Sequence, residues 1–312
     1  MHFDVEELQI DGPLAKFRSV EPQRLGVDDQ AEGLRRMLVS SQTQIITLVA
    51  GKSGLGRTSV TLNLAAALCN AGRDVLVLDE NPAPHNLTDS LGMFVRHDLL
   101  DVIQGRCQLV DALVRSQGYA ILPVARLMRA LKTLNPFEQQ QLENVLAEAG
   151  NGVDVMLVDA AMLTDQIVAS SSLSSGVRVL VVMDASTSGI TESYALIKRL
   201  ALENARLRFE IVVNRVANEE TARLVFGNME KVARRNLAAR LEYLGYIPKD
   251  ERLKRATQLG RSVVEAFPAA ASAKSCMALS QSVLQMTKGE VEGGISLMMK
   301  NLIRQLARQQ LA

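Results

Sequence analysis

The sequence has few of the residues that fasten a chain with disulfides or metal ions. Its 312 residues include three cysteines, three histidines and no tryptophan. Cys69, Cys107 and Cys276 are odd in number, widely spaced and without a CxxC pair, which argues against a disulfide framework and against a structural zinc site. The histidines, among them His85, have no Cys or His neighbour at metal-ligand spacing. This pattern favours a reducing cytosol as the compartment.

Net charge and long apolar runs are missing as well. Lys and Arg number 35 against 34 Asp and Glu, a formal net charge of +1, so no global field attracts nucleic acid and no direct nucleic-acid binding is expected. No uncharged apolar run approaches the roughly 18 to 20 residues that span a bilayer. Residues 1–30 are acidic and lack the basic start and apolar centre of a signal peptide. We therefore expect a protein that is neither secreted nor transmembrane.

Apolar material is plentiful: 47% of the residues are hydrophobic and 22% are charged, enough for one large or two ordinary domains. Short, β-branched apolar runs alternate with helical patterns from residue 44 onward. The expected strands are Gln44–Ala50, Asp74–Asp79, Tyr119–Val124, Val153–Asp159, Val177–Asp184 and Phe209–Asn214. Because these runs are continuously hydrophobic, they predict strands buried on both faces, hence an α/β fold with a doubly wound, mainly parallel sheet and helices on both faces.

The same patterns divide the chain into three parts. Residues 1–43 contain scattered Pro, Gly and charge, which is typical of a flexible arm, and they include a short helix over Asp29–Val39. Residues 44–288 make up the α/β domain, whose final helix is expected over Ala269–Met286. Residues 289–312 begin with a glycine-rich joint and continue as an amphipathic helix.

A glycine-rich segment lies where the first expected strand passes into a helix over Thr58–Ala71. Its sequence is Gly51-Lys-Ser-Gly-Leu-Gly-Arg-Thr-Ser59. In this context backbone N–H groups and the helix N-terminus cradle phosphates. The common P-loop pattern, G-x-x-x-x-G-K-[ST], fits the segment if Arg57 takes the place of the lysine. The alternative is an ordinary strand-to-helix turn.

Arg57 departs from the common P-loop pattern. The lysine of that pattern places a compact ammonium between the β and γ phosphate oxygens, and the broader guanidinium of an arginine cannot take the same position. Thr58 keeps a hydroxyl suited to Mg²⁺. Asp79 and Asp159 end two expected strands, at the carboxyl edge where such sheets bind ligands, although a lone strand-end Asp is often no more than a cap. Together these residues favour a nucleotide site over a simple turn.

Lys52, five residues before Arg57, makes the loop resemble the deviant Walker A motif, K-G-G-x-G-K-T, of the MinD/ParA ATPases. Within that superfamily the chain resembles the FlhG/FleN flagellar-number regulators, also called YlxH. Asp29-Gln-Ala31 with Leu34-Arg35 resembles their D-Q-A-x-x-L-R motif. The segment Tyr194–Lys198 resembles their Y-A-L-I-K, and Leu241–Asp250 resembles their L-x-Y-L-G-x-I-P-x-D.

The resemblance implies a role for each matching residue. Lys52 would reach the nucleotide of the partner subunit, so a nucleotide-dependent homodimer is implied. Thr58 and Asp159 would hold Mg²⁺, and Asn214 would contact the adenine of ATP or ADP. The implied nucleotide-binding residues are Gly51, Lys52, Ser53, Gly54, Leu55, Gly56, Arg57, Thr58, Ser59 and Asn214, which makes 44–288 a nucleotide-binding domain.

Of the two catalytic positions that the resemblance implies, Lys52 is kept and Asn81 is altered. The family has D-x-D where this chain has Asp79-Glu-Asn81, so the carboxylate that orients the attacking water is absent. The switch after the Walker B strand lacks its glycine in Asp159-Ala-Ala-Met-Leu163. With Arg57, these changes predict a weak or lost ATPase, because phosphoryl transfer depends on positioning and on neutralising charge. Nucleotide binding stays open, because Arg57 either clasps the phosphates or blocks them.

The C-terminal helix has an apolar face and a basic face. Apolar side chains recur at helical spacing at Ile295, Met298, Met299, Leu302, Ile303 and Leu306. Lys300, Arg304 and Arg308 lie on the opposite side, and this +3 local charge is typical of a helix that lies in an anionic membrane surface. A helix packed on the domain is the alternative. The FlhG and MinD resemblance favours the membrane, hence a cytoplasmic protein peripheral at the inner face of the cell membrane, at a pole or elsewhere.

The sequence pattern of the short helix over Asp29–Val39, taken alone, is more typical of a solvent-exposed segment before the domain than of a docking site. In the family that the chain resembles, this segment stimulates FlhF, a GTPase of the signal-recognition-particle type. The resemblance therefore implies partner-binding roles for Gln30, Leu34 and Arg35, with Gln30 as the candidate contact.

Three functions remain open from the sequence. The first is a switch that regulates flagellar number or placement through an FlhF-type GTPase, the membrane and a flagellar transcription activator, with weak or absent ATP hydrolysis. The second is a competent MinD/ParA-type ATPase with a membrane cycle, in which Arg57 is tolerated. The third is a nucleotide-free scaffold. Turnover separates the first two, and failure of ATP to raise the melting temperature favours the third.

Overall fold

The computed structural model describes residues 43–116, 118–161, 178–203, 208–237 and 239–286. The predicted arm, apart from Thr43, and the predicted C-terminal helix lie outside these residues. The partner-binding residues Gln30, Leu34 and Arg35 and all the membrane-facing residues named above therefore stay predictions. Among the described residues, no helix is long and apolar enough to cross a membrane.

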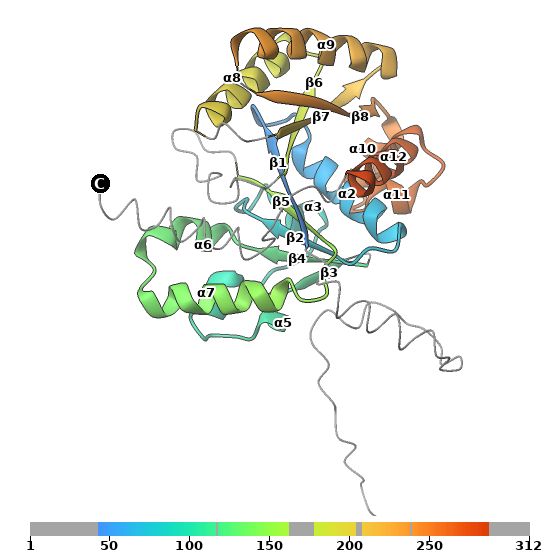
Figure 1. Cartoon of the computed structure of the whole chain (residues 1–312). Coiled ribbons are helices and arrows are strands. Elements are labelled where there is room, and N and C mark those ends of the chain that lie inside the picture. Colours follow the sequence, from blue (N-terminus) through green and yellow to red (C-terminus); the bar gives the residue numbers. More distant parts are fainter. Residues whose placement is uncertain (1–42, 117, 162–177, 204–207, 238, 287–312) are drawn as a thin grey trace, which may run out of the picture.

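The centre of the fold is one sheet, in which the described residues form eight strands in the order β3-β4-β2-β5-β1-β6-β7-β8 (Figure 1). Neighbouring strands run parallel, apart from the antiparallel pair β3 and β4. The strands are β1 Gln44–Ala50, β2 Val75–Asp79, β3 Val114–Ser116, β4 Tyr119–Pro123, β5 Val155–Asp159, β6 Arg178–Asp184, β7 Arg208–Val216 and β8 Arg240–Pro248. The predicted doubly wound, mainly parallel sheet is confirmed.

Helices connect the parallel strands. They are α2 Arg57–Asn70, α3 Leu87–Ser90, α4 Leu99–Ile103, α5 Leu109–Ala112, α6 Ala125–Ala130, α7 Pro136–Ala149, α8 Thr187–Glu203, α9 Glu219–Asn236, α10 Glu251–Gln258, α11 Val263–Ala266 and α12 Ala271–Gln285, with a 3₁₀ turn over Leu131–Thr133. The expected helices over Thr58–Ala71 and Ala269–Met286 correspond to α2 and α12, within one or two residues at each end.

The six predicted strands are all present, and two further strands extend the sheet. Edge strand β8 has mostly half-buried side chains and a register shift against β7, so it lacks the continuous apolar run that marks the inner strands. Strand β3 has three residues and pairs with β4 at the other edge. Edge strands with one partner need less apolar surface, which is why the hydrophobic pattern did not predict them.

The two faces of the sheet bury alternate side chains of the same strand. Ile46 and Leu48 of β1 pack with α2, α11 and α12 on one face. Ile45 and Val49 point to the other face, where α4 to α7 cover one half of the sheet and α8 and α9 cover the other (Figure 1). Helices on both faces explain why the inner strands are apolar throughout.

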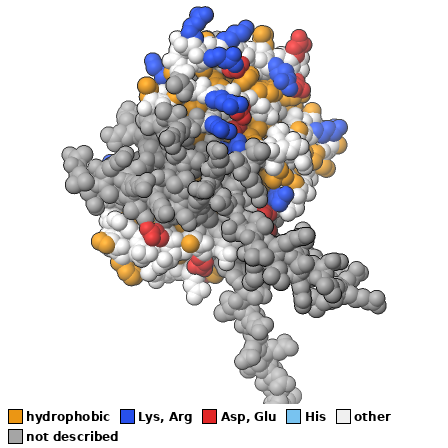
Figure 2. Space-filling model, viewed as in Figure 1, with side chains coloured by type: hydrophobic (Ala, Val, Ile, Leu, Met, Phe, Trp, Pro, Cys, Tyr) orange, Lys and Arg blue, Asp and Glu red, His pale blue; other side chains and the backbone are white. Residues whose placement is uncertain are grey.

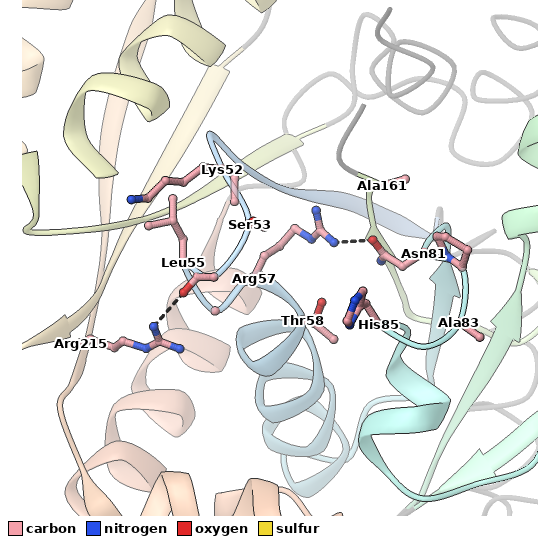
Figure 3. A pocket seen from close by; sticks show the side chains of 14 residues that line it. Lys52, Ser53, Leu55, Arg57, Thr58, Asn81, Ala83, His85, Ala161 and Arg215 are labelled. Carbon is pink, nitrogen blue, oxygen red and sulfur yellow. Dashed lines mark hydrogen bonds between the residues drawn. The ribbon is translucent and has the colours of Figure 1, made fainter. Parts of the chain in front are cut away.

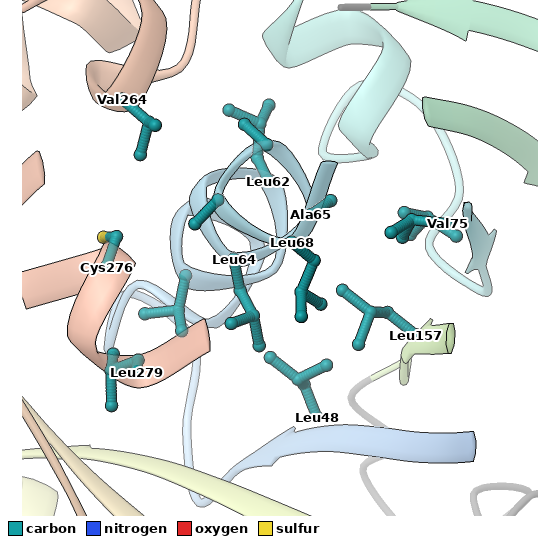
Figure 4. Close-up of a cluster of buried hydrophobic side chains, with 14 of the residues drawn as sticks. Leu48, Leu62, Leu64, Ala65, Leu68, Val75, Leu157, Val264, Cys276 and Leu279 are labelled. Carbon is teal, nitrogen blue, oxygen red and sulfur yellow. The ribbon is translucent and has the colours of Figure 1, made fainter. Parts of the chain in front are cut away.

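Helix α2, which follows the glycine-rich loop, lies between the sheet and α12 (Figure 4). Its Leu64 and Leu68 are fully buried, with Leu48 and Leu157 of the sheet on one side and Leu279 of α12 on the other. A helix enclosed in this way needs apolar side chains nearly all round, as its sequence RTSVTLNLAAALCN has. The packing fixes the helix N-terminus, and with it the loop, against the ends of the strands.

The cysteines are free thiols, as the absence of a disulfide pattern predicted. Cys276 is buried on α12, and burial raises the pKa of its thiol to about 12. The pKa of the Cys69 thiol, near the end of α2, is also raised to about 12, mainly by burial and further by the charge of Asp74. Both thiols are therefore protonated at neutral pH and serve as packing side chains.

Lys and Arg side chains gather over the part of the surface where α8 and α9 lie (Figure 2). Several of the basic residues of α9 are paired along the helix: Arg223 with Glu219 and Arg234 with Glu230. Exposed pairs of this kind contribute little stability, typically below about 1 kcal/mol each. The basic residues there are partly neutralised locally, which agrees with the small net charge of the chain.

Candidate functional site

The loop between β1 and α2 bends back on itself at glycines that no larger residue could replace. Gly56, the residue before α2, has a φ of 89°, and a Cβ there would lie 2.4 Å from Nδ2 of Asn214. A Cβ on Gly51 would lie 2.3 Å from the backbone carbonyl carbon of Glu192 on α8. Both distances are below any real van der Waals contact, so these glycines permit a close approach of the loop to its neighbours.

Strand β7 holds the loop from the side. Asn214 is buried, and its Nδ2 donates to the carbonyl oxygen of Leu55 at 2.8 Å. Arg215, with a φ of 56°, donates from Nη1 to the carbonyl oxygen of Gly54 at 2.7 Å (Figure 3). Two consecutive residues at the carboxyl end of β7 thus bind two carbonyl oxygens of the loop and hold it in place.

A cavity of about 560 Å³ opens beside the loop (Figure 3). It is lined by Ala50, Lys52, Ser53, Gly54, Leu55, Gly56, Arg57, Thr58, Asn81, Pro82, Ala83, His85, Ala161 and Arg215. The structure therefore brings seven of the predicted nucleotide-binding residues, Lys52 to Thr58, around one cavity together with the predicted catalytic position Asn81. Gly51, Ser59 and Asn214 do not line it among the described residues, and the predicted contact of Asn214 with adenine stays a prediction.

Asp159 lies at the centre of a hydrogen-bond network at the end of β5, next to the loop. Its Oδ1 accepts from Nε of Arg57 at 2.7 Å and from Oγ1 of Thr61 at 3.1 Å. Its Oδ2 accepts from Oγ1 of Thr58 at 2.8 Å and from Nδ2 of Asn81 at 2.8 Å. The Asp159 side chain is 0% exposed and that of Arg57 is 9% exposed, so this is a buried ion pair.

Asn81 bridges the ion pair and the neighbouring strand β2. Its Oδ1 accepts from Nη2 of Arg57 at 2.6 Å, and its Nδ2 donates to Asp159 and, at 3.0 Å, to Oδ1 of Asp79. Asp79 stands directly beside Asp159 in the sheet register. Burial, and then the charge of Asp159, raise the pKa of Asp79 to about 7.

Magnesium was expected at Thr58 and Asp159, and the structure does bring these two side chains together. The observed arrangement does not fit the ion, however. Mg²⁺ demands near-octahedral oxygen ligands at about 2.0–2.1 Å. Here the Asp159 oxygens receive four protein donors, one of which is the positively charged guanidinium of Arg57. Among the described residues, no group of three His, Cys, Asp or Glu side chains could hold a metal ion instead.

Lys52 points away from Arg57 and Asn81 (Figure 3). Its Nζ donates to Oγ of Ser188 on α8 at 2.5 Å, whereas Arg57 turns to the opposite side, toward Asp159. Lys52 thus lines the cavity with its ammonium bonded to α8.

Three residues at the site were not expected from the sequence. Thr61, one turn into α2, completes the set of donors around Asp159, and His85 and Arg215 line the cavity. Arg215 could have been found, because it follows Asn214 at the carboxyl end of a parallel strand, where such sheets bind ligands. Nothing in the sequence pattern marks His85, which comes from the loop after β2.

The switch segment after β5 is described only at its start. The N–H of Ala161 donates to Oε2 of Glu80 at 3.0 Å, which ties the end of β5 to the residue between Asp79 and Asn81. Met162 and Leu163, which stand where the family has its switch, lie outside the described residues.

A parallel sheet with a glycine-rich loop between its central strand β1 and α2, and with aspartates ending the adjacent strands β2 and β5, defines a P-loop protein of the α/β class. The chain belongs to the family of CobQ/CobB/MinD/ParA nucleotide binding domains, whose model matches residues 46–263. The resemblance to this superfamily that the loop motif indicated is confirmed.

Within this family the chain is similar to flagellar regulators. It is 35% identical over 252 residues to the antiactivator FleN of Pseudomonas aeruginosa, a match that covers 80% of this chain and 89% of FleN. It is 28% identical over 222 residues to the flagellum site-determining protein YlxH of Helicobacter pylori, covering 68% of this chain and 72% of YlxH.

Among solved structures, the septum site-determining protein MinD of Pyrococcus horikoshii, complexed with Mg-ADP, has a TM-score of 0.61 to the chain. Its sequence is 26% identical, and the match covers 79% of this chain and 98% of that protein. The fold of the described domain is therefore that of MinD.

Proposed function

We propose that the protein is a nucleotide-dependent regulator of flagellar number or placement that binds ATP or ADP and hydrolyses ATP weakly or not at all. The observation that carries the proposal is the loop cavity of a MinD-like P-loop domain. At this cavity Arg57 and Asn81, bonded to each other, stand where the family has a lysine and a water-orienting aspartate. The similarity to FleN and YlxH supports the flagellar context.

Impaired hydrolysis follows from the chemistry of the two side chains. Phosphoryl transfer needs a positioned water and neutralisation of the charge that develops on the phosphate. The amide of Asn81 cannot act as a carboxylate toward water, and its oxygen already accepts from Arg57. Arg57 is in turn bound to Asp159, so neither side chain is placed to serve in transfer as its counterpart would.

The direct test is isothermal titration with ATP and with ADP, followed by sizing of each sample. The proposal expects both nucleotides to bind and ATP to favour a dimer. A protein that binds neither nucleotide, and whose melting temperature neither one raises, would be the nucleotide-free scaffold. The four protein donors on Asp159 are the observation that favours this second candidate.

Lys52→Ala is expected to weaken ATP-dependent dimerisation while changing nucleotide affinity less than about threefold. The reason is that Nζ of Lys52 is directed toward Ser188 of α8 and away from Arg57 and Thr58 of its own loop (Figure 3), an orientation that suits the nucleotide of a partner copy. Sedimentation or sizing with and without ATP measures the effect. Lys231→Ala, which removes an exposed lysine of α9, is the matched control. A wild-type protein that is monomeric with every nucleotide would refute the role of Lys52.

The proposed partner of residues 1–43 is an FlhF-type GTPase. Gln30→Ala is expected to abolish stimulation of GTP hydrolysis by that partner and to leave the melting temperature unchanged, because Gln30 precedes β1, the first strand of the described sheet. Gln23→Ala is the control within the same segment. Full stimulation by the Gln30→Ala variant would place the docking site elsewhere, and a lower melting temperature would give Gln30 a structural role.

The proposed role of residues 289–312 is to bind the inner face of the cell membrane. Removal of the residues after Glu292 is expected to abolish sedimentation with anionic vesicles and to leave the melting temperature unchanged. Each basic residue near an anionic surface contributes about 1 kcal/mol, so Lys300, Arg304 and Arg308 together change partitioning by roughly 100-fold, an effect that salt screens.

Two substitutions separate burial in lipid from simple charge. Leu302→Glu places a carboxylate in the apolar stripe and is expected to reproduce the truncation. Asn301→Glu adds the same charge on the polar side and is expected to weaken binding far less. If the intact protein ignores vesicles at low salt and truncation lowers its melting temperature by many degrees, the helix packs on the domain.

We further propose that nucleotide-dependent dimerisation and membrane binding decide when the protein meets its protein partners, which include a flagellar transcription activator. The name of FleN, an antiactivator, supports this partner class.

A further inference from the structure

We infer that the Arg57 guanidinium is the resident cation of this site and takes the place of Mg²⁺, so that a nucleotide binds here without a divalent metal ion. The inference rests on the proposed function, because it presupposes that a nucleotide enters the cavity. It concerns how that nucleotide's phosphates are neutralised.

Hydrogen bonding engages both carboxylate oxygens of Asp159. An ionised carboxylate offers about four acceptor positions. The two Asp159 oxygens lie 2.7 to 3.1 Å from four donor atoms, of Arg57, Thr58, Thr61 and Asn81, and the hydroxyl of Thr61 lies 3.1 Å from the carbonyl oxygen of Arg57 as well. A Mg²⁺ ion bound directly to Asp159 would compete with these donors, above all with the positively charged guanidinium of Arg57.

Charge also disfavours a divalent ion. The buried carboxylate of Asp159 is already balanced by Arg57, which lies 2.7 Å from it and is nearly enclosed. Asn81 adds no negative charge on the other side of the guanidinium. A Mg²⁺ ion at this site would therefore be repelled by the fixed positive charge of Arg57. Position 81 provides no carboxylate that would offset this repulsion.

The guanidinium is held in a position from which it can still bind phosphate. Nε is bonded to Asp159. Nη2 is bonded to Asn81 (Figure 3), whereas Nη1 has no hydrogen-bond partner among the described residues. Arg57 lines the cavity beside the loop and Thr58. Arginine donates readily to phosphate oxygens, and a side chain fixed in advance loses less conformational entropy on binding.

Asn81 is then a positioning residue matched to Arg57. Its amide accepts from the guanidinium and donates to Asp159, Asp79 and the backbone oxygen of Asp159. A carboxylate at this place could not donate, and it would stand against two other aspartates. Arg57 and Asn81 therefore form one unit that replaces both the metal ion and its surroundings.

Calorimetric titration of the full chain with ADP, in excess MgCl₂ and in excess EDTA, tests the inference. The wild-type protein is expected to bind ADP in EDTA at least as tightly as in Mg²⁺, because no metal has to be accommodated. The ammonium of the Arg57→Lys variant cannot bind Asp159 and Asn81 together. In excess MgCl₂ this variant is expected to bind ADP more tightly than the wild-type protein does. When EDTA replaces MgCl₂, its affinity for ADP is expected to fall at least about tenfold. Arg73→Lys, at an exposed site, is the control.

A second measurement does not depend on the variant. Mn²⁺ is added to the wild-type protein with bound ADP and, separately, to buffer that contains ADP but no protein. The two samples are expected to give the same electron paramagnetic resonance signal, because no Mn²⁺ is bound to the protein. Wild-type affinity for ADP that falls about tenfold in EDTA, or a protein-bound Mn²⁺ signal, overturns the inference and leaves nucleotide binding intact. No binding of ADP in either buffer overturns the proposed function and the inference with it.

Discussion

Arg57→Lys combined with Asn81→Asp is expected to raise the rate of ATP hydrolysis at least about 100-fold above the wild-type rate. The lysine returns a compact ammonium to the loop and releases Asp159 from its guanidinium. The aspartate returns a carboxylate that can orient water, and with Asp159 it provides the negative charge that Mg²⁺ needs. Phosphate release under excess MgATP measures the rate.

The single variants sharpen this result. Asn81→Asp alone is expected to gain little, because the new carboxylate would remain engaged by Arg57 and could not make the donor bonds of the native amide to Asp79 and Asp159. Arg73→Lys with Asn144→Asp makes the same chemical changes at exposed positions and serves as the control. An unchanged rate in the double variant would contradict the account of the two side chains and would shift the defect to Met162 and Leu163.

Asp159→Ala is expected to lower the free energy of unfolding by about 3–5 kcal/mol, the usual cost of leaving a buried charge unpaired. Arg57 has 9% of its side chain exposed, and Asp159 is its ion-pair partner among the described residues. Thr58, Thr61 and Asn81 would lose an acceptor at the same time. Urea denaturation monitored by circular dichroism gives the difference.

Two further variants identify the cause of that loss. Asp184→Ala removes the aspartate that ends β6, which lies on the other side of β1. Asp184 accepts from Ser186 in a local, exposed contact, so its loss is expected to cost less than about 1 kcal/mol. Arg57→Leu added to Asp159→Ala is expected to restore part of the stability, because it removes the unpaired charge. A double variant less stable than Asp159→Ala alone would show that packing, and not charge, dominates.

The hydrophobic pattern predicted most of the fold for a clear physical reason. Inner strands such as Val155–Asp159 are covered by helices on both faces, so their sequences are apolar without interruption. Strand β8 escaped prediction because it lies at an edge and is half-buried. The loop and its strand-end aspartates were placed correctly because the carboxyl ends of parallel strands meet at one edge of a sheet.

The orientation of side chains in the site could not be predicted from the sequence. The motif aligned Arg57 with a phosphate-binding lysine, yet its guanidinium turns toward Asp159 and Asn81. That choice depends on which acceptors lie within reach of a long, branched donor, and these come from the ends of β2 and β5, far apart along the chain. Asn81 likewise looked like a lost catalytic group, whereas the structure gives it a second role as the partner of Arg57.

Recovery of bound nucleotide after incubation with ATP tests the central claim most directly. The protein is mixed with ATP, freed of unbound nucleotide by rapid gel filtration, held for increasing times and extracted with acid for chromatography. The account predicts that nucleotide is retained and stays ATP, while the Arg57→Lys, Asn81→Asp variant converts it to ADP. Wild-type protein that converts ATP as fast as this variant, or that retains no nucleotide, would contradict a switch that binds ATP without turning it over.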